Sequence, residues 1–241
     1  VRFNIGTFPK LEIDQTKTLV QNPTCFGDMN GSVTIEAQGG TGISYKYSWE
    51  NGSNSPTLSN IPAGTYFVTI SDSNNCTQRD SFTLTQPSKL EASIDLAASV
   101  VLDCNNQDNG KLAIKTTGGN PGIKTISWQS GVNTNGNVAI NLIPGTYCAT
   151  VSDNFGCKDT ICQTLTAPEP LKGKINTPVE PVCYGEKTCI SVDYVTGGTG
   201  NNYTFQIRNL NNAIRFPLDT CINVFAGQYI VSLIDSAGCS I

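Results

Sequence analysis

The ten cysteines are the residues of this chain best suited to chemistry, and no histidine accompanies them. A zinc site would call for Cys-x-x-Cys pairs or added histidines, and the sequence contains neither. The absence of histidine also excludes the commonest general base and every Ser-His or Cys-His catalytic pair. We therefore expect no enzyme and no cofactor. The cysteines indicate disulfides formed in an oxidising, extracellular compartment.

Six of the cysteines mark a frame that occurs three times. Its first copy consists of Cys25, Gly39-Gly40, Trp49, Tyr66, Asp72 and Cys76. Its second copy consists of Cys104, Gly118-Gly119, Trp128, Tyr147, Asp153 and Cys157. Its third copy consists of Cys183, Gly197-Gly198, Ile207, Tyr229, Asp235 and Cys239. In every copy the first glycine lies 14 positions after the opening cysteine and the closing cysteine lies 4 positions after the aspartate, and opening cysteines recur every 79 residues.

Several motifs of the first copy together resemble a known family. They are Cys-x-Gly-Asp-x-Asn-Gly, Gly-Gly-Thr-Gly, Tyr-Ser-Trp, Pro-Ala-Gly-Thr-Tyr and Asp-x-x-x-Cys. These look like the SprB-type repeat, which fills long surface adhesins of gliding Bacteroidetes. The resemblance covers nearly the whole chain, and the third copy departs most, with Ile207 in place of Trp. It implies a cell-surface protein exported by the type IX system and moved by the gliding motor.

The spacing of apolar residues is that of β-strands. Tyr66, Val68 and Ile70 alternate with polar or outward positions, and no stretch of ten residues shows a helical period. About seven short strands in each 79-residue period predict an all-β chain of tandem immunoglobulin-like β-sandwich domains. A net charge of -4 argues against nucleic acid as a partner, and no apolar run approaches the length of a membrane span.

The repeat period also predicts the domain boundaries. Residues 1–8 match the last strand of a preceding repeat, because 1–12 resemble 80–91. Repeat one is then 9–88, repeat two 89–169, and repeat three 170–241 without its final strand. Both ends fall inside a motif, so we expect an excerpt of a longer polymer. The linkers between repeats contain proline and no Gly/Ser run, which predicts a semi-rigid rod.

Five disulfides are expected from the cysteine positions. Repeat arithmetic assigns one frame bridge to each copy, namely Cys25–Cys76, Cys104–Cys157 and Cys183–Cys239. The four remaining cysteines predict two bridges on outer faces, Cys148–Cys162 across a hairpin and Cys189–Cys221 between neighbouring strands. The apolar residues that follow Cys189 are shifted by one position against repeat one, which a β-bulge would explain.

Acidic residues beside the frame cysteines are weak candidates for calcium. The frame bridges would draw them together in pairs, which are Asp28 with Asp72, Asp108 with Asp153, and Glu186 with Asp235. In the alternative interpretation each acid caps its own turn by accepting hydrogen bonds from nearby backbone amides. We favour this alternative, because the sequence has no dense Asp/Asn ladder.

Three other patterns could carry function. The family resemblance implies O-glycans at Asp-(Ser/Thr)-apolar triplets, with candidates at Thr160, Ser236 and, more weakly, Ser81. Gly39-Gly-Thr-Gly42 is interpreted as a turn, because no helix or lysine follows as in a phosphate loop. Trp49 and Trp128 could stack on sugars, but their position in strands favours the core.

Two functions fit these features. The first is a structural and adhesive repeat of a long, secreted cell-surface filament, which serves gliding motility and surface attachment. Its partners would be neighbouring repeats of the same chain, the gliding and type IX secretion machinery, and surface or glycan ligands bound elsewhere in the parent protein. The second is an accessory array, a spacer or glycan binder, in a secreted polysaccharide-degrading enzyme. A row of exposed aromatic residues on one face would favour glycan binding.

Overall fold

The computed structural model describes residues 7–41, 44–105, 107–176, 180, 183–209, 213–218 and 220–241. Every regular element in these residues is a β-strand, so the all-β prediction is confirmed. None of the described residues forms a helix of the length and apolar character needed to cross a membrane. The strand predicted for residues 1–8 lies mostly outside the described residues.

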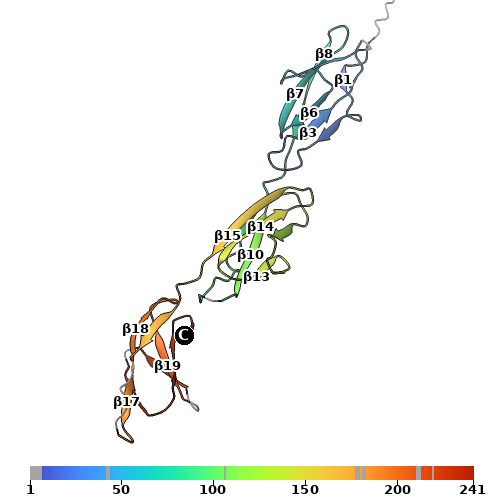
Figure 1. Ribbon diagram of the computed structural model, residues 1–241. Coiled ribbons are helices and arrows are strands. Elements are labelled where there is room, and N and C mark those ends of the chain that lie inside the picture. The colour runs from blue at the N-terminus through green and yellow to red at the C-terminus, as the bar shows by residue number, and fades with distance from the viewer. Residues whose placement is uncertain are drawn as a thin grey trace, which may run out of the picture. The chain divides into compact units, whose positions relative to one another are not determined.

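Repeat one folds into two three-stranded antiparallel sheets and a short ribbon (Figure 1). The first sheet has the order β2-β3-β6, formed by Leu19–Gln21, Gly31–Thr34 and Thr57–Ile61. The second has the order β5-β7-β8, formed by Lys46–Trp49, Gly64–Ser71 and Thr77–Leu84. The ribbon pairs β1 with β4, which are Glu12–Ile13 and Ala37–Gln38. All of these pairings are antiparallel.

The core of repeat one lies between its two sheets. Val33 of β3 and Leu58 of β6 are buried together with Val68 and Ile70 of β7 and with Leu84 of β8. These positions alternate with exposed or half-buried neighbours along each strand, as the period-two pattern predicts. Burial of one face of each sheet against the other therefore supplies the driving force for a β-sandwich.

Repeat two has the same plan with a larger first sheet. That sheet has the order β12-β13-β10-β9, formed by Thr134–Asn135, Val138–Leu142, Gly110–Thr117 and Glu91–Ile94. The second sheet has the order β11-β14-β15, formed by Thr125–Trp128, Gly145–Ser152 and Lys158–Leu165. Leu112, Leu142 and Leu165 are buried in one cluster that draws on both sheets.

The described residues of repeat three form three separate strand groups. Lys172–Ile175 (β16) pairs with Val192–Thr196 (β18), and Lys187–Ile190 (β17) pairs with Ile222–Phe225 (β21). The third group has the order β20-β19-β22, formed by Ala213–Pro217, Thr204–Arg208 and Ile230–Ile234. The register between β16 and β18 shifts between Lys174 and Ile175. The shift skips Asp193, which lies among the residues 190–194 whose apolar positions are offset against repeat one.

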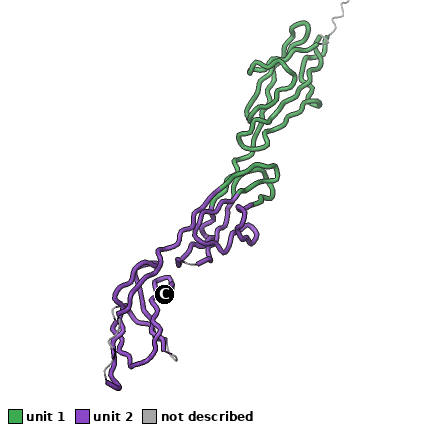
Figure 2. Tube along the Cα trace, viewed as in Figure 1, with its two compact units in different colours: residues 1–93, 116–126, 150–160 green, residues 94–115, 127–149, 161–241 purple. Residues whose placement is uncertain are grey.

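Contacts divide the chain into two compact units (Figure 2). Unit 1 holds residues 1–93, 116–126 and 150–160, and unit 2 holds 94–115, 127–149 and 161–241. Unit 1 therefore contains all of repeat one and parts of repeat two, and unit 2 contains the rest of repeat two and all of repeat three. The domain boundaries near residues 88 and 169, and the semi-rigid rod, stay predictions.

Candidate functional site

Four of the six frame cysteines form disulfides, and these join different repeats. Cys25 is bonded to Cys157 within unit 1, and Cys104 is bonded to Cys239 within unit 2, each with 5.6 Å between the Cα atoms. The expected bridges Cys25–Cys76, Cys104–Cys157 and Cys183–Cys239 are therefore wrong. In both bonds the opening cysteine of one repeat is joined to the closing cysteine of the following repeat. Two cysteines, Cys76 and Cys183, carry no disulfide, so the expectation that all ten are oxidised is also wrong for this chain.

The length of one strand explains why pairing within a repeat fails. Gly31, at the start of β3, pairs with Ile61, just before β7, so the loop after Cys25 lies at the end of the domain where β7 begins. The eight residues of β7 then lead to the turn that ends at Cys76. At about 3.4 Å per residue this strand covers roughly 25 Å, whereas a disulfide needs Cα atoms about 4.4–6.8 Å apart.

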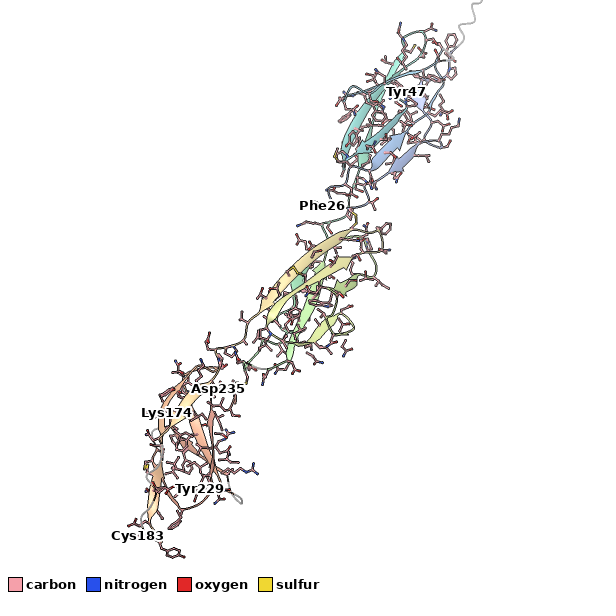
Figure 3. The ribbon with its side chains drawn as sticks, viewed as in Figure 1. Phe26, Tyr47, Lys174, Cys183, Tyr229 and Asp235 are labelled. Atoms are coloured by element: carbon pink, nitrogen blue, oxygen red, sulfur yellow. A yellow bond between two sulfur atoms is a disulfide. The ribbon has the colours of Figure 1, made fainter. Side chains whose placement is uncertain are left out.

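The side-chain view shows the same separation. In repeat one, the labelled Phe26 follows Cys25, while Tyr47 pairs with Ile70 at the far end of β7, and Figure 3 places the two at opposite ends. In repeat three, Figure 3 places Cys183 and Asp235 at opposite ends as well. The opening and closing cysteines of one repeat are thus held apart by the sandwich itself.

The two additional bridges are those expected from the strand positions. Cys148 is bonded to Cys162, and paired hydroxyls on either side, Thr146 with Thr164 and Thr150 with Thr160, show that the two cysteines face one another across β14 and β15. Cys189 is bonded to Cys221, and β17 does pair with β21. Neither pair is part of a buried core cluster.

An aspartate organises each closing turn, which we define as residues 72–76, 153–157 and 235–239. In the first turn, Oδ1 of Asp72 accepts hydrogen bonds from the backbone N–H groups of Asn74 (3.0 Å) and Cys76 (2.9 Å). Asp153 and Asp235 accept the equivalent pairs of bonds in their own turns. All three aspartates are buried. Each one therefore fixes the backbone of the closing cysteine that follows it.

The other carboxylate oxygen ties the closing turn to the glycine pair. Oδ2 of Asp153 accepts from the backbone N–H of Asn120 at 2.9 Å, and Oδ2 of Asp72 accepts from that of Thr41 at 2.9 Å. The second glycine of the pair is needed here, because a Cβ at Gly40 would lie 2.8 Å from Oδ2 of Asp72. The Gly-Gly and Asp-x-x-x-Cys motifs of the frame are thus in direct contact, with the aspartate bonded to both turns.

The first glycine of each pair packs on the beginning of its own repeat. Gly118 has a φ of +68°, and a Cβ there would lie 1.9 Å from the carbonyl oxygen of Lys89. Gly39 and Gly197 make the same close approach to Lys10 and Pro170. The sequence predicted a turn at these glycines, but it did not show that they hold the first segment of the repeat against the closing end.

Side-chain contacts accompany each disulfide. The residue after the glycine pair, Asn120, donates from Nδ2 to the carbonyl oxygen of Thr24 at 3.0 Å. At the second bond the equivalent Thr199 donates from Oγ1 to the carbonyl oxygen of Asp103 at 2.5 Å. In both cases the acceptor residue directly precedes the opening cysteine. We call each of the two disulfides between repeats, together with this side-chain hydrogen bond, a joint.

The opening cysteine is also held by a short turn. The backbone N–H of Cys25 donates to Oδ2 of Asp28 at 3.1 Å, and the N–H of Asp28 donates back to the carbonyl oxygen of Cys25 at 3.1 Å. Glu186 makes the same two contacts with Cys183. In repeat two the equivalent hydrogen bond runs from the backbone N–H of Gln107 to the carbonyl oxygen of Cys104. The next residue, Asp108, is exposed.

These hydrogen bonds shift the acidity of two closing-turn aspartates. The backbone N–H of Thr41 is the largest cause that lowers the pKa of Asp72, which falls to about 2 although desolvation opposes the change. For Asp153 desolvation is the largest single influence and raises the pKa, but the bonds from Asn120, Phe155 and Cys157 together outweigh it, so that its pKa is lowered. Both side chains are therefore anionic at neutral pH.

Five of the six calcium candidates act as turn caps in the structure, and the sixth, Asp108, is exposed. Asp28, Asp72, Asp153, Glu186 and Asp235 all accept from backbone N–H groups of their own turns. The pairing of Asp28 with Asp72, and the two equivalent pairings, depended on the wrong frame bridges. Among the described residues no group of three or more His, Cys, Asp or Glu side chains could hold a metal ion. The capping interpretation therefore fits the geometry better than a calcium site.

The tryptophans lie in or against the cores. Trp49 is 2% exposed, and its Nε1 donates to the carbonyl oxygen of Ser55. Trp128 is half-buried against the core cluster of repeat two. Tyr66, Tyr147 and Tyr229 each donate a hydroxyl hydrogen bond to the carbonyl oxygen four residues earlier. This recurring bond resembles the tyrosine corner of immunoglobulin-like domains.

A cavity lies beside each joint. The cavity of 420 Å³ at Cys25–Cys157 is lined by charged side chains that include Asp28, Lys89 and Asp159. The cavity of 340 Å³ at Cys104–Cys239 is lined by Asn105, Gln107 and Ser240 instead, and none of the described lining residues has a charged side chain. Because the lining differs between equivalent joints, the cavities do not form a repeated ligand site.

The three O-glycosylation candidates are exposed. Thr160 and Ser81 lie on β15 and β8, and Ser236 lies in a closing turn. Asp235, the acid of the third triplet, is buried by the bonds described above. Exposure permits modification, and the glycosylation itself stays a prediction.

These features define a class of protein, namely a tandem array of antiparallel β-domains cross-linked by disulfides. Residues 18–54 match the family model of the SprB repeat, which is consistent with a SprB-type repeat. The matched stretch contains the opening Cys25, the glycine pair and Trp49 of the first frame copy. Together, the frame and the match point to a non-catalytic, structural or adhesive repeat module. Among curated proteins none matches this sequence.

Several solved structures are similar to the chain. Immunoglobulin domains 1 to 5 of Sidekick-1 match with a TM-score of 0.38 and 13% identity, over 98% of this chain and 58% of that one. This chain thus spans little more than half the length of that structure. Domains from titin match with a TM-score of 0.30 and 13% identity, over 95% of this chain and 94% of that one. Extracellular domains 3 to 5 of Drosophila OTK match with a TM-score of 0.28 and 12% identity, over 96% and 97%.

Proposed function

We propose that this chain is a load-bearing segment of a long, secreted cell-surface adhesin filament that serves gliding motility and surface attachment. The observation that carries the proposal is the joint. Successive repeats are connected twice, once by the peptide linker and once by a disulfide between opening and closing cysteines. A filament under tension gains from this double connection, because a second covalent bond limits how far each segment lengthens.

The same bonds support an extracellular location. Four disulfides in one chain require an oxidising compartment, which favours the cell surface over the cytoplasm. The gliding motor and the type IX export system enter through the resemblance to SprB repeats. The site of adhesion lies elsewhere in the parent protein, and this segment transmits force to it.

The distribution of exposed aromatics favours the spacer over a glycan-binding array. Among the described residues, exposed aromatic rings include Phe8, Phe67, Phe155 and Tyr194, which occupy different positions of the frame. The exception is the position after the opening cysteine, where Phe26 and Tyr184 are both exposed. A glycan-binding face built by repetition would place aromatic rings at several equivalent positions of each copy.

Localisation and movement on the cell provide the decisive test. Beads coated with antibody against this chain should bind living cells of the source organism and travel along their surface. Beads coated with pre-immune antibody are the control. Detection of the antigen only inside cells, or only in a complex with a polysaccharide-degrading enzyme, would contradict the proposal.

A binding measurement separates the two functions at the molecular level. The oxidised chain, immobilised and exposed to a panel of soluble polysaccharides, should retain no more of them than an unrelated β-sandwich does. Saturable retention of one polysaccharide, lost when Tyr184→Ala removes the most exposed ring, would favour the accessory glycan-binding function.

A further inference from the structure

Two frame cysteines carry no disulfide, and they occupy complementary positions. Cys76 is the closing cysteine of repeat one, and Cys183 is the opening cysteine of repeat three. Both are exposed. The other four frame cysteines all form bonds from an opening to a closing position. The chain thus presents one unused opening cysteine and one unused closing cysteine.

The opening turn at Cys183 has the geometry of a bonded one. Its N–H donates to Oε2 of Glu186 at 3.2 Å, as the N–H of the bonded Cys25 donates to Asp28 at 3.1 Å. The neighbouring side chain differs in exposure, because Tyr184 is fully exposed at 108% while its equivalent at the first joint, Phe26, is 53% exposed. Figure 3 shows Cys183 at the end of repeat three that lies away from Asp235.

The closing turn at Cys76 also has the geometry of a bonded one, although Cys76 forms no disulfide. Its N–H donates to Oδ1 of Asp72 at 2.9 Å, the bond that also fixes the closing cysteines of both joints. One contact differs. Oγ1 of Thr41 donates inward to Oδ2 of Asp72, whereas the equivalent hydroxyl of Thr199 donates across the joint to the carbonyl oxygen of Asp103. The hydroxyl of Thr41 is therefore a donor that could turn to a backbone carbonyl oxygen of a partner when a joint forms.

We propose that Cys183 and Cys76 are two halves of further joints of the same kind. Cys183 takes the closing end of another SprB-like repeat, and Cys76 takes the opening end of another. The partner is recognised by its own frame. The partner of Cys76 must present an opening cysteine with a backbone carbonyl oxygen beside it, and the partner of Cys183 must present a closing cysteine with a hydrogen-bond donor beside it. In the isolated chain, a second copy supplies both partners, so that Cys183 of one copy bonds to Cys76 of the next.

The bond forms by thiol–disulfide exchange with a low-molecular-weight disulfide such as oxidised glutathione. The thiolate of one cysteine attacks the disulfide, forms a mixed disulfide and releases one glutathione thiol. The second cysteine attacks the mixed disulfide and releases the other. Two protein thiols are oxidised to one disulfide, one glutathione disulfide is reduced to two thiols, and no further reactant is needed.

A mixing experiment with the full chain tests the proposal. Cys76→Ser leaves only the opening thiol, and Cys183→Ser leaves only the closing thiol. Each variant alone, kept at high concentration with oxidised glutathione, should remain mostly monomeric. An equimolar mixture should give a dimer in at least several-fold higher yield, linked only through Cys183 and Cys76 by non-reducing peptide mapping, with the four existing bridges unchanged. The unmodified chain should give a ladder of head-to-tail oligomers.

A matched pair of variants separates recognition from chance oxidation. Thr41→Val removes the donor of the closing end and should slow dimer formation in the mixture several-fold. Thr65→Val, which makes the same change on β7 where Thr65 faces Thr83, should leave the rate unchanged. Equal yields of mixed and unmixed dimers would overturn the proposal, and so would the absence of any dimer in the mixture. Neither result would bear on whether the chain is part of a gliding filament.

Discussion

At the scale of single residues, the buried aspartates of the closing turns do the most to shape the molecule. Each receives hydrogen bonds from two backbone N–H groups of its own turn and from one N–H of the glycine-pair turn. A carboxylate with several N–H donors is stabilised as the anion, which is the reason for the low pKa of Asp72. Protonation would weaken these bonds and loosen the backbone of the closing turn.

The acidity of Asp72 gives a prediction about pH. Its pKa in the folded chain is about 2, below the value near 3.9 of an unfolded chain. The carboxylate therefore stabilises the fold fully above about pH 4, and this contribution is lost as the pH falls toward 2. A carboxyl ¹³C titration should place the midpoint of Asp72 near pH 2. The loss of thermal stability between pH 4 and 2 should be smaller in Asp72→Asn, and an identical loss in both proteins would contradict the prediction.

The tyrosine that begins each long strand gives a second prediction. The hydroxyl of Tyr66 donates to the carbonyl oxygen of Pro62 at 2.8 Å. Tyr66→Phe should destabilise repeat one by about 1 kcal/mol, the usual net value of one hydrogen bond. The control is Tyr194→Phe, since Tyr194 is 52% exposed and its hydroxyl has no hydrogen bond within the described residues. Urea denaturation should show a lower midpoint for Tyr66→Phe alone.

At the scale of elements, the eight-residue strands β7 and β14 set the distance between the two ends of a repeat. They carry the closing turn to the end opposite the opening turn, so that a cysteine pair can form only between repeats. The glycine-pair turn then brings the first segment of the repeat against the closing turn, with the N–H of Gly119 bonded to the carbonyl oxygen of Ser88 at 2.9 Å. The joint therefore depends on a close backbone approach.

That approach predicts an unequal response of two glycines in repeat two. Gly118 and Gly131 both have positive φ, at +68° and +85°, so alanine costs each about 1–2 kcal/mol from backbone strain. A Cβ at Gly118 would also lie 1.9 Å from the carbonyl oxygen of Lys89, whereas nothing lies within 4 Å at Gly131. Gly118→Ala should therefore be clearly the more destabilising in thermal unfolding. Equal effects would show that the close approach is unimportant.

At the scale of the whole molecule, the crossed disulfides determine how far the chain can lengthen under tension. A within-repeat bridge would have shielded the 51 residues between Cys25 and Cys76, but the bonds found span 132 and 135 residues and overlap. Pulled between residues 9 and 241, the oxidised chain has a shortest covalent path of about 70 residues. At about 3.4 Å per residue it should extend to roughly 240 Å, against roughly 790 Å when every bridge is reduced.

Removal of one bond distinguishes crossed pairing from pairing within repeats. In Cys25→Ser with Cys157→Ser, crossed pairing leaves a shortest path of about 100 residues, or roughly 330 Å. Pairing within repeats would lose two bridges in the same variant and allow roughly 540 Å. Single-molecule extension in oxidising buffer measures this length directly. A value near the longer length would refute the crossed arrangement, and Cys148→Ser with Cys162→Ser, which changes the path very little, is the control.

The sequence by itself determined the strands, the repeat and the additional bridges, because each depends on short-range information. Alternation along β7 and the fixed distances around Asp72 and Tyr66 follow from local geometry, and so does the facing of Cys148 and Cys162 across a hairpin. The family resemblance likewise depended on motifs within one copy of the frame.

Only the tertiary structure decided which frame cysteines are bonded. Every copy has the same frame, so Cys25–Cys76 and Cys25–Cys157 agree equally well with the period, and periodicity cannot choose between them. The choice depends on which end of the sandwich each cysteine occupies, and that is set by the pairing of Gly31 with Ile61 and by the length of β7. The expected pairing of Asp28 with Asp72 was wrong for the same reason, because the two acids lie at opposite ends of a strand that is about 25 Å long.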